Sequence, residues 1–180
     1  MIKLIVFQGP SGSGKTTLQK KFGAPKIITC TTRSPRTTEK NDIDYHFMNR
    51  ESFELLIKQG KMLEVTQYKS NLYGTLLDSV TNIEDEVKSI VLDYSGAKRV
   101  KELLKEKCFR IGVYANKNDC EKRLYKRQHN LEEVSQRMNS YDFEVKALNG
   151  CEIIINNSDS YWDNVEWILH SLKEEIQKYN

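Results

Sequence analysis

Glycine, lysine and threonine follow one another near the start of the chain at a spacing suited to holding phosphate groups. Residues 8–18 read QGPSGSGKTTL, in which Gly9, Gly14, Lys15 and Thr16 fit the pattern G-x-x-x-x-G-K-[ST]. The glycines let backbone N–H groups approach phosphate oxygens, the lysine can bridge the outer phosphates, and the threonine hydroxyl can bind Mg²⁺. This stretch predicts a nucleoside triphosphate site and leaves open which molecule receives the phosphate.

The neighbours of this loop support that interpretation. An apolar run at 2–7 predicts a buried strand before the loop, and residues 15–22 predict a short helix after it. A helix that begins at the loop adds the positive end of its dipole to the phosphate site. We expect ATP to contact the loop at Gly9, Ser11, Gly12, Ser13, Gly14, Lys15, Thr16 and Thr17.

A carboxylate at the end of another apolar strand is a second candidate metal ligand. The run SIVLD at 89–93 predicts a buried strand that ends at Asp93. In phosphate-transferring proteins with such a loop, a carboxylate that faces magnesium usually lies at this position. An ordinary cap at the end of the strand explains Asp93 equally well, so both interpretations stay open.

A second group of anion-binding side chains lies in the stretch TTRSPRTTEKNDIDY at 31–45. Arg33 and Arg36 stand three residues apart in a loop that contains a proline. The planar forks of arginine suit a phosphate dianion, and two of them set both its position and its charge. The pair therefore predicts a site for an acceptor phosphate, with a solvated basic loop as the alternative.

The residues that follow form an ordered set with these arginines. Tyr45 lies in DYHF, Glu64 in KMLEV, and Tyr73 with Gly74 in NLYGT. Together with TTRSPR, this set resembles the guanylate kinases, and the resemblance covers nearly the whole chain. It implies an enzyme of purine nucleotide metabolism that phosphorylates GMP, and also dGMP, with ATP and Mg²⁺.

The resemblance also implies a role for each residue of the set. In the family, two arginines and two tyrosines hold the phosphate of GMP, and a strand glutamate pairs with guanine. The role of Glu64 fits independently, because guanine presents N1–H and an exocyclic amine on one edge, and a carboxylate accepts from both. The implied GMP-binding residues are Thr29, Arg33, Arg36, Tyr45, Glu64, Tyr73, Gly74 and Thr75.

One segment departs from the family pattern. The family strand usually ends L-D-x-D-x-x-G, and its second Asp also contacts the guanine amine. This chain reads LDYSG at 92–96, two residues shorter, with Ser95 where that Asp would fall. Either Asp93 takes over the contact, or Ser95 and Thr29 make it with less stringency. A different or relaxed base preference therefore remains open.

Three arginines further along the chain predict a lid. Arg123 and Arg127 are four residues apart and share a helix face, and Arg137 follows on the next helix. By resemblance, these arginines close over the triphosphate and act in catalysis with Lys15, because phosphoryl transfer needs charge neutralisation and exclusion of water. A solvated basic helix is the alternative. The resemblance also implies that Asn156 and Asn157, after the last strand of the core, lie near adenine.

The order of apolar and polar runs predicts an α/β fold of the P-loop NTPase class. We expect a parallel sheet flanked by helices, an inserted mixed-sheet subdomain for the nucleoside monophosphate, and a helical lid. The core is expected at 1–31, 81–116 and 144–180, the GMP-binding subdomain at 32–80, and the lid at 117–143. Within these parts we expect a strand at 26–31, one extended segment at 62–73, and helices at 77–88, 118–128 and 131–143.

Composition limits the classes of protein that the chain can belong to. Its 180 residues, 38% hydrophobic and 29% charged, suit one globular domain, and a net charge of +3 gives no reason to expect a nucleic-acid partner. No apolar run reaches the length of a membrane span, so we expect no membrane association. The four cysteines are widely spaced, which predicts reduced thiols and a cytoplasmic location. Monomer and homodimer remain open.

Two rival functions remain at this stage. The first is a binding module that resembles guanylate kinases but has lost catalysis; an intact loop with Lys15 and Thr16 argues against it. The second is a kinase of the same fold that acts on another nucleotide or on a phosphorylated sugar. The two tyrosines and Glu64 argue against the sugar, whereas LDYSG keeps another base possible.

Overall fold

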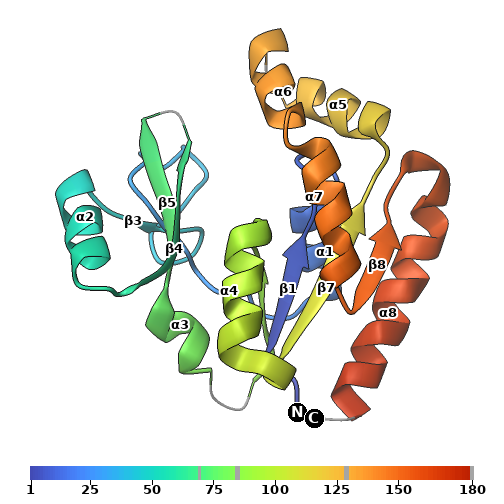
Figure 1. Cartoon of the computed structure of the whole chain (residues 1–180), viewed down its shortest axis with the longest axis horizontal. Helices are drawn as coiled ribbons and strands as arrows, with labels where there is room; N and C mark the ends of the chain where they lie inside the picture. Colours follow the sequence, from blue (N-terminus) through green and yellow to red (C-terminus); the bar gives the residue numbers. More distant parts are fainter. Residues whose placement is uncertain (69, 84–85, 128–129, 179–180) are drawn as a thin grey trace.

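The framework of the protein is a pair of four-stranded sheets (Figure 1). The computed structural model describes residues 1–68, 70–83, 86–127 and 130–178, except for the side chains of Tyr68 and Asp163. The first sheet is parallel throughout and has the strand order β6–β1–β7–β8. Its strands are β1 (Leu4–Gln8), β6 (Lys88–Val91), β7 (Cys108–Tyr114) and β8 (Ile153–Asn156).

Helices cover both faces of this sheet, which explains why β1 is apolar along its whole length. Leu4 and Val6 pack on the side of α4, while Ile5 and Phe7 pack on the side of α1 and α8. All four side chains are fully buried. The helices of this part are α1 (Lys15–Phe22), α4 (Tyr94–Leu104), α7 (Tyr141–Ala147) and α8 (Trp162–Lys178), with 3₁₀ turns at Lys105–Lys107, Leu148–Gly150 and Asp159–Tyr161.

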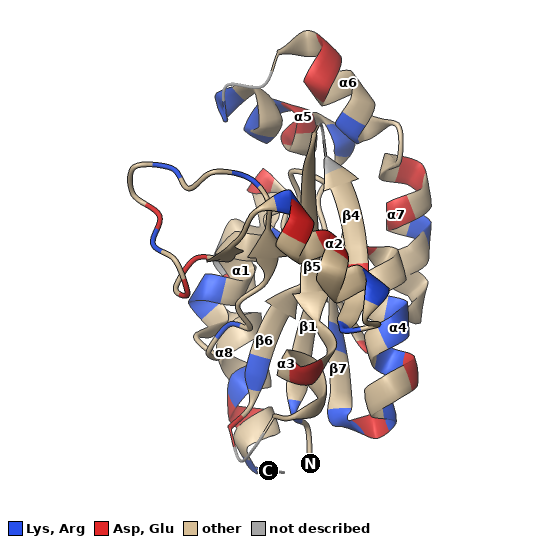
Figure 2. Cartoon of the chain, turned by 90° about the vertical axis from the view of Figure 1, so that its left-hand side faces the viewer, with Lys and Arg blue, Asp and Glu red and all other residues tan. Residues whose placement is uncertain are grey.

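The second sheet has the order β3–β2–β5–β4 and mixes parallel with antiparallel pairs. Its elements are β2 (Cys30–Thr31), β3 (His46–Phe47), α2 (Arg50–Lys58), β4 (Met62–Tyr68), β5 (Asn71–Leu76) and α3 (Leu77–Thr81). The loop between β2 and β3 projects from the molecule and carries both signs of charge (Figure 2). The expected fold class, a P-loop core with an inserted mixed sheet, is confirmed.

The helices α5 (Lys117–Lys126) and α6 (Leu131–Met138) stand above the carboxyl ends of the parallel strands (Figure 1). They share a small apolar cluster that includes Cys120, Leu124 and Val134. The expected helix at 131–143 is wrong, because the chain turns after Met138 and a separate helix, α7, begins at Tyr141. The Tyr141 hydroxyl donates to the Ala115 carbonyl oxygen at 2.7 Å, which fixes the new direction. Residue 128, the expected end of the preceding helix, lies outside the described residues.

The expected strand at 26–31 is wrong, because this segment is divided between the two sheets. Ile27 N–H donates to the Ser89 carbonyl oxygen at 2.8 Å, which attaches the segment to the edge of the first sheet at β6. Three residues later, Cys30 already pairs with His46 and Gly74 in the second sheet. The chain therefore crosses between the sheets at residues 28 and 29.

Two other expectations for this region are corrected. The extended segment at 62–73 is a hairpin, in which Tyr68 pairs with Asn71 and β5 runs back along β4. The helix expected at 77–88 is only α3, which ends at Thr81, since Lys88 pairs with Leu4 and begins β6. Of the residues expected in that helix, 84 and 85 lie outside the described part of the chain.

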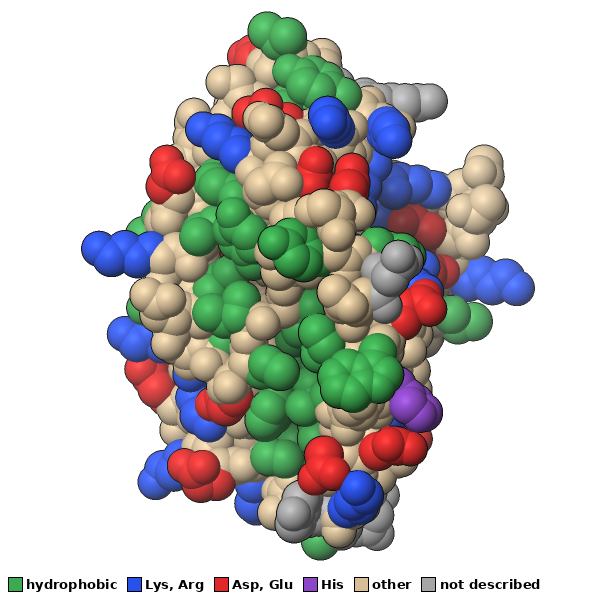
Figure 3. Space-filling model, turned by 90° about the vertical axis from the view of Figure 1, so that its right-hand side faces the viewer, with side chains coloured by type: hydrophobic (Ala, Val, Ile, Leu, Met, Phe, Trp, Pro, Cys, Tyr) green, Lys and Arg blue, Asp and Glu red, His purple; other side chains and the backbone are tan. Residues whose placement is uncertain are grey.

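The face formed by β8 and α8 carries exposed apolar side chains (Figure 3). Ile154 on β8 is 46% exposed and Trp167 on α8 is 71% exposed. β8 is an edge strand, so its outer backbone groups have no neighbouring strand in the described structure. Within that structure, no helix combines the length and the apolar character that crossing a membrane requires.

Candidate functional site

The glycine-rich loop lies between β1 and α1, at the carboxyl end of the central strand of the first sheet. Gly12 has a φ of 83° and Gly14 a φ of 98°, so both adopt backbone conformations that side chains disfavour. Both are also crowded: a Cβ on Gly12 would lie 2.5 Å from the Cys120 carbonyl oxygen, and one on Gly14 would overlap the Asn157 amide. The loop is thus held against α5 and against the residues that follow β8.

Lys15 is bound to the loop that precedes it. Its Nζ donates to the carbonyl oxygens of Gly9 at 2.6 Å and Pro10 at 2.9 Å. Burial lowers the pKa of Lys15 to about 8, although the negative charge of Glu144 opposes this shift; Arg127 and Arg137 lower the pKa further. An anion placed here would restore the lysine's charge, as expected for a phosphate-binding group.

Asn157, which the resemblance placed near adenine together with Asn156, braces the loop. Its side chain is buried, and Nδ2 donates to the Ser13 carbonyl oxygen at 2.7 Å. The neighbouring Asn156 accepts from the backbone N–H and the hydroxyl of Ser158. The structure therefore gives both asparagines a local role, and their contact with adenine stays a prediction.

The structure separates the three lid arginines. Arg123 donates to the carbonyl oxygens of Gly12 at 3.3 Å, Ser13 at 3.4 Å and Asn157 at 2.7 Å, and it forms an ion pair with Asp159 at 2.6 Å. The hydrogen bond from Arg123 holds the pKa of Asp159 below its usual range. Arg123 thus ties α5 to the outside of the loop.

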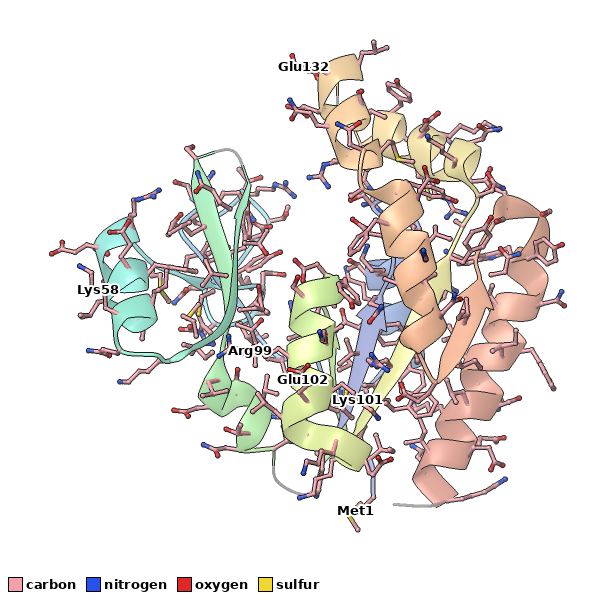
Figure 4. All side chains as sticks on the ribbon, viewed as in Figure 1. Met1, Lys58, Arg99, Lys101, Glu102 and Glu132 are labelled. Atoms are coloured by element: carbon pink, nitrogen blue, oxygen red, sulfur yellow. The ribbon has the colours of Figure 1, made fainter. Side chains whose placement is uncertain are left out.

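Arg127 and Arg137 instead line a cavity of about 1060 Å³ that joins the loop, the second sheet and the lid helices. Figure 4 shows side chains of β4 and β5 on one side of this region and those of α5 and α6, with Glu132 near the tip of α6, on the other. The lining residues are Ser11, Thr16, Arg33, Arg36, Glu39, Tyr45, Thr66, Tyr73, Arg127, Arg137 and Ser140.

One end of this cavity brings arginine side chains and aromatic rings together. The guanidinium of Arg33 lies over the rings of Tyr45 and Phe47, 5.6 Å from each centroid. The rings of Tyr45 and Tyr73 meet edge to face at 6.3 Å. Burial raises the pKa of Tyr45, so its hydroxyl keeps its proton and can donate to an anion. The structure thus brings together Tyr45, Tyr73 and the two arginines that the sequence singled out.

Two carboxylates and two threonines lie close together between β4 and the start of α4. Thr75 is fully buried and donates to Glu64 at 2.8 Å, while Thr66 donates to Asp93 at 3.3 Å. Burial raises the pKa of Glu64, the Thr75 hydrogen bond opposes that shift, and the charge of Asp93 raises the pKa further. The carboxylates are therefore near enough to interact.

The other residues expected to contact the base lie at the start of α4, on β5 and next to β2. Asp93 caps α4, since its Oδ1 accepts from Gly96 N–H at 2.8 Å, and its role as a magnesium ligand stays a prediction. Ser95 is exposed in the first turn of that helix. Gly74 packs closely, because a Cβ there would lie 2.6 Å from the Glu64 carbonyl oxygen. Thr29 lines a neighbouring cavity of about 440 Å³, together with Thr16 and Tyr45 among others.

A metal ion would find few protein ligands here. Among the described residues, no three His, Cys, Asp or Glu side chains gather in a way that could hold one. Thr16 is exposed at the start of α1 and lines the larger cavity. This donor set suits Mg²⁺, which commonly binds through few protein oxygens together with nucleotide phosphates and water.

Comparisons with known proteins agree with this geometry. A family model for guanylate kinases matches residues 1–179. A guanylate kinase from Prochlorococcus marinus subsp. pastoris is 34% identical over 166 residues, which cover 87% of this chain and 90% of that protein. One from Malacoplasma penetrans is 30% identical over 186 residues, covering 97% and 94%. The crystal structure of guanylate kinase from Anaplasma phagocytophilum has the same fold, with a TM-score of 0.68 at 22% identity, covering 99% of this chain and 85% of that one.

Proposed function

This chain belongs to the guanylate kinase family and is an ATP-dependent kinase that phosphorylates GMP, and we propose that it works with Mg²⁺ and accepts dGMP as well. One observation carries the assignment of roles to residues. A single cavity is lined by Ser11 and Thr16 of the phosphate-binding loop and by Arg33, Tyr45 and Tyr73 on the other side. Donor and acceptor phosphates can therefore meet within it.

The donor end holds ATP through the loop 9–17 and the amine of Lys15. Binding of the phosphates replaces the Gly9 and Pro10 carbonyl oxygens as partners of the amine. Thr16 would hold Mg²⁺ together with the phosphates, and the ion would supply positive charge that offsets the charge on the transferred group. Arg123 keeps α5 on the loop, and Asn156 lies on the adenine side.

The acceptor end holds the phosphate of GMP through Arg33, Arg36, Tyr45 and Tyr73. One of its oxygens attacks the terminal phosphorus of ATP in line. The new P–O bond forms as the bond to the bridging oxygen breaks, and that oxygen leaves with ADP. Arg127 and Arg137 of the lid, 117–143, supply charge and exclude water as the lid closes.

The base of GMP lies against Glu64, with Asp93 as the second carboxylate. The Thr66–Asp93 contact and the effect of Asp93 on the pKa of Glu64 support this assignment. In this proposal, Asp93 of the shortened LDYSG segment takes over the contact of the missing Asp. Thr29, Gly74, Thr75 and Ser95 surround this group, and the subdomain 32–80 carries most of the acceptor site.

The state of the cysteines supports a reducing compartment, which we take to be the cytoplasm. The four cysteines, all within the described residues, are free thiols. Burial raises the pKa of Cys108 to about 12 and that of Cys30 to about 11, so these thiols stay protonated. They are inert packing groups and do not act as nucleophiles.

Acceptor choice tests the proposal most directly. ADP formation from ATP and Mg²⁺ would be followed with GMP, dGMP, IMP, AMP, CMP and UMP. We expect turnover with GMP and dGMP only, because two carboxylates can accept both N1–H and the amine of guanine. Comparable turnover with IMP would show that the amine is not recognised and would favour a relaxed kinase. Binding of GMP without turnover would favour the inactive binding module.

A further inference from the structure

One acidic side chain lies among the cations that line the large cavity. Glu39 shares the lining with Arg33, Arg36, Arg127 and Arg137. A carboxylate repels a phosphate dianion, so its presence in an acceptor phosphate site is unexpected on charge alone. Its contacts indicate what it does there.

Glu39 binds Arg33 through both of its oxygens. Oε2 accepts from Nη1 and Oε1 from Nη2, each at 2.9 Å. This fork-to-fork geometry is the strongest form of such an ion pair. Both side chains are largely covered, with 18% of Arg33 and 15% of Glu39 exposed. The hydrogen bond from Arg33 is also the main reason that the pKa of Glu39 lies below its usual range.

The same carboxylate organises the backbone around Arg36. The Arg36 N–H donates to Glu39 Oε2 at 2.8 Å, and the Glu39 N–H donates to the Arg36 carbonyl oxygen at 3.0 Å. These contacts close residues 33–39 into a compact turn within a loop that otherwise projects from the sheet. One side chain thus links the two arginines that the acceptor phosphate needs.

Counting donors shows which edge of Arg33 is occupied by Glu39. Its two Nη1 hydrogens go to Glu39 and to the Ser34 carbonyl oxygen, the latter at 2.7 Å, and one Nη2 hydrogen goes to Glu39. The other edge, with Nε–H and the second Nη2 hydrogen, forms another fork that can meet an anion. The hydrogen bond to Glu39 is the main reason that the pKa of Arg33 is raised, and Tyr73 adds to this shift.

We propose that Glu39 is a positioning residue of the acceptor site, which holds one edge of Arg33 and the backbone of Arg36 so that the Arg33 guanidinium meets the GMP phosphate already oriented, with Arg36 held beside it. The inference rests on the proposed function, since it assumes that this phosphate binds between the arginines and tyrosines. Aromatic rings on the face of Arg33 and Glu39 on its edge leave little to rearrange on binding. Such preorganisation improves affinity by reducing its entropic cost.

The test measures steady-state kinetics and GMP binding by calorimetry for the whole protein and its Glu39→Gln variant. We expect the KM and Kd for GMP to rise about tenfold or more, with kcat and the KM for ATP changed less than about threefold. The ratio of kcat/KM for GMP to that for dGMP should not change, because the two share the same phosphate. Glu54→Gln is the matched control, since it breaks an exposed Arg–Glu pair in the same part of the chain, with Arg50 Nε 2.8 Å from Glu54 Oε1.

A second comparison shows whether Glu39 acts through Arg33. In an Arg33→Lys background, which cannot form the fork, Glu39→Gln should add little to the loss of GMP affinity. Glu39→Asp provides a variant that keeps the charge if Glu39→Gln folds poorly, and it should weaken GMP binding less. Unchanged or tighter GMP binding in Glu39→Gln would overturn the proposal, the latter because Glu39 would then compete with the phosphate. Absence of GMP turnover in the unmodified protein would instead reject the proposed function.

Discussion

The two halves of the site are built from different parts of the chain. The donor half is a buried stretch of backbone, in which Gly12 and Ser13 are packed under α5 and the residues after β8. The acceptor half consists of side chains from β4, from β5 and from an exposed loop, in which Arg36 is open to solvent. Backbone recognition suits a phosphate chain shared by all nucleotides, whereas side chains can be exchanged to suit one base.

This difference predicts that the donor half tolerates substitution poorly and that the acceptor half can be altered one side chain at a time. The largest effect is expected for Lys15→Ala. We expect kcat to fall by about 10³ or more, because the lysine neutralises charge that develops during transfer. Steady-state assays with ATP and GMP would measure it.

Lys20→Ala, an exposed lysine on the same helix, is the matched control and should retain full activity. A change in KM for ATP with kcat preserved would mean that Lys15 contributes to binding alone. In that case the donor half would only bind its ligand, as the acceptor half does, and would not stabilise the transition state.

Two glycines with similar backbone conformations test the comparison through stability. Gly12→Ala places a Cβ 2.5 Å from the Cys120 carbonyl oxygen, whereas Gly60, with a φ of 67°, has nothing within 4 Å. We expect Gly12→Ala to lower the free energy of unfolding by about 3 kcal/mol or more, and Gly60→Ala by about 1 kcal/mol from its positive φ alone. Urea denaturation would measure both, and equal losses would contradict the crowding described at the loop.

Glu64→Gln tests the acceptor half. The amide cannot accept from both N1–H and the amine, so we expect kcat/KM for GMP to fall by about 10², and that for IMP to fall less. The KM for ATP should stay within about twofold, because the donor half is built separately. Initial rates with GMP and with IMP would measure the two losses in kcat/KM. An equal loss for GMP and IMP would show that Glu64 does not contact the amine.

The smallest effect is expected from pH. In the free protein, burial lowers the pKa of Lys15 to about 8, and ATP must bind to the protonated amine. We therefore expect kcat/KM for ATP to fall about tenfold for each unit above pH 8, and Lys15→Arg to lack this loss. Between pH 8 and 10.5 the unfolded chain binds more protons at this residue, so its contribution to stability rises with pH. A flat profile up to pH 9.5 would contradict the assigned pKa.

The two halves also differed in how far they could be predicted from sequence. The loop 9–16 was predictable from its own residues, because glycine spacing and the flanking strand and helix are local features. The acceptor residues are spread from Thr29 to Asp93, and only resemblance to a known family connected them. Their approach depends on pairing between β2, β3 and β5, which short strands with little periodicity do not reveal.

Other errors arose where long-range contacts overrode local pattern. The segment 26–31 reads KIITCT, rich in β-branched residues as a strand would be, yet its second half pairs with the other sheet. Arg123 was expected to share a helix face with Arg127. Its ion pair with Asp159, far along the chain, instead holds the Arg123 side chain on the outside of the loop. No pattern within the lid could have distinguished these arginines. The contact of Asn157 with the loop was not predicted for the same reason, because its partner Ser13 lies at the opposite end of the sequence.

The crossing of the chain between the sheets has a mechanical consequence. Ile27 packs in the core of the first sheet and Cys30 in that of the second, so Ile28 and Thr29 form a short covalent link between the two cores. In any rigid rotation, atoms near the axis sweep the shortest arc. If one sheet turned about this link, Thr29 would move least and the tip of the loop at 36–40 would move furthest. Small changes of torsion at the link would thus become large displacements of the loop.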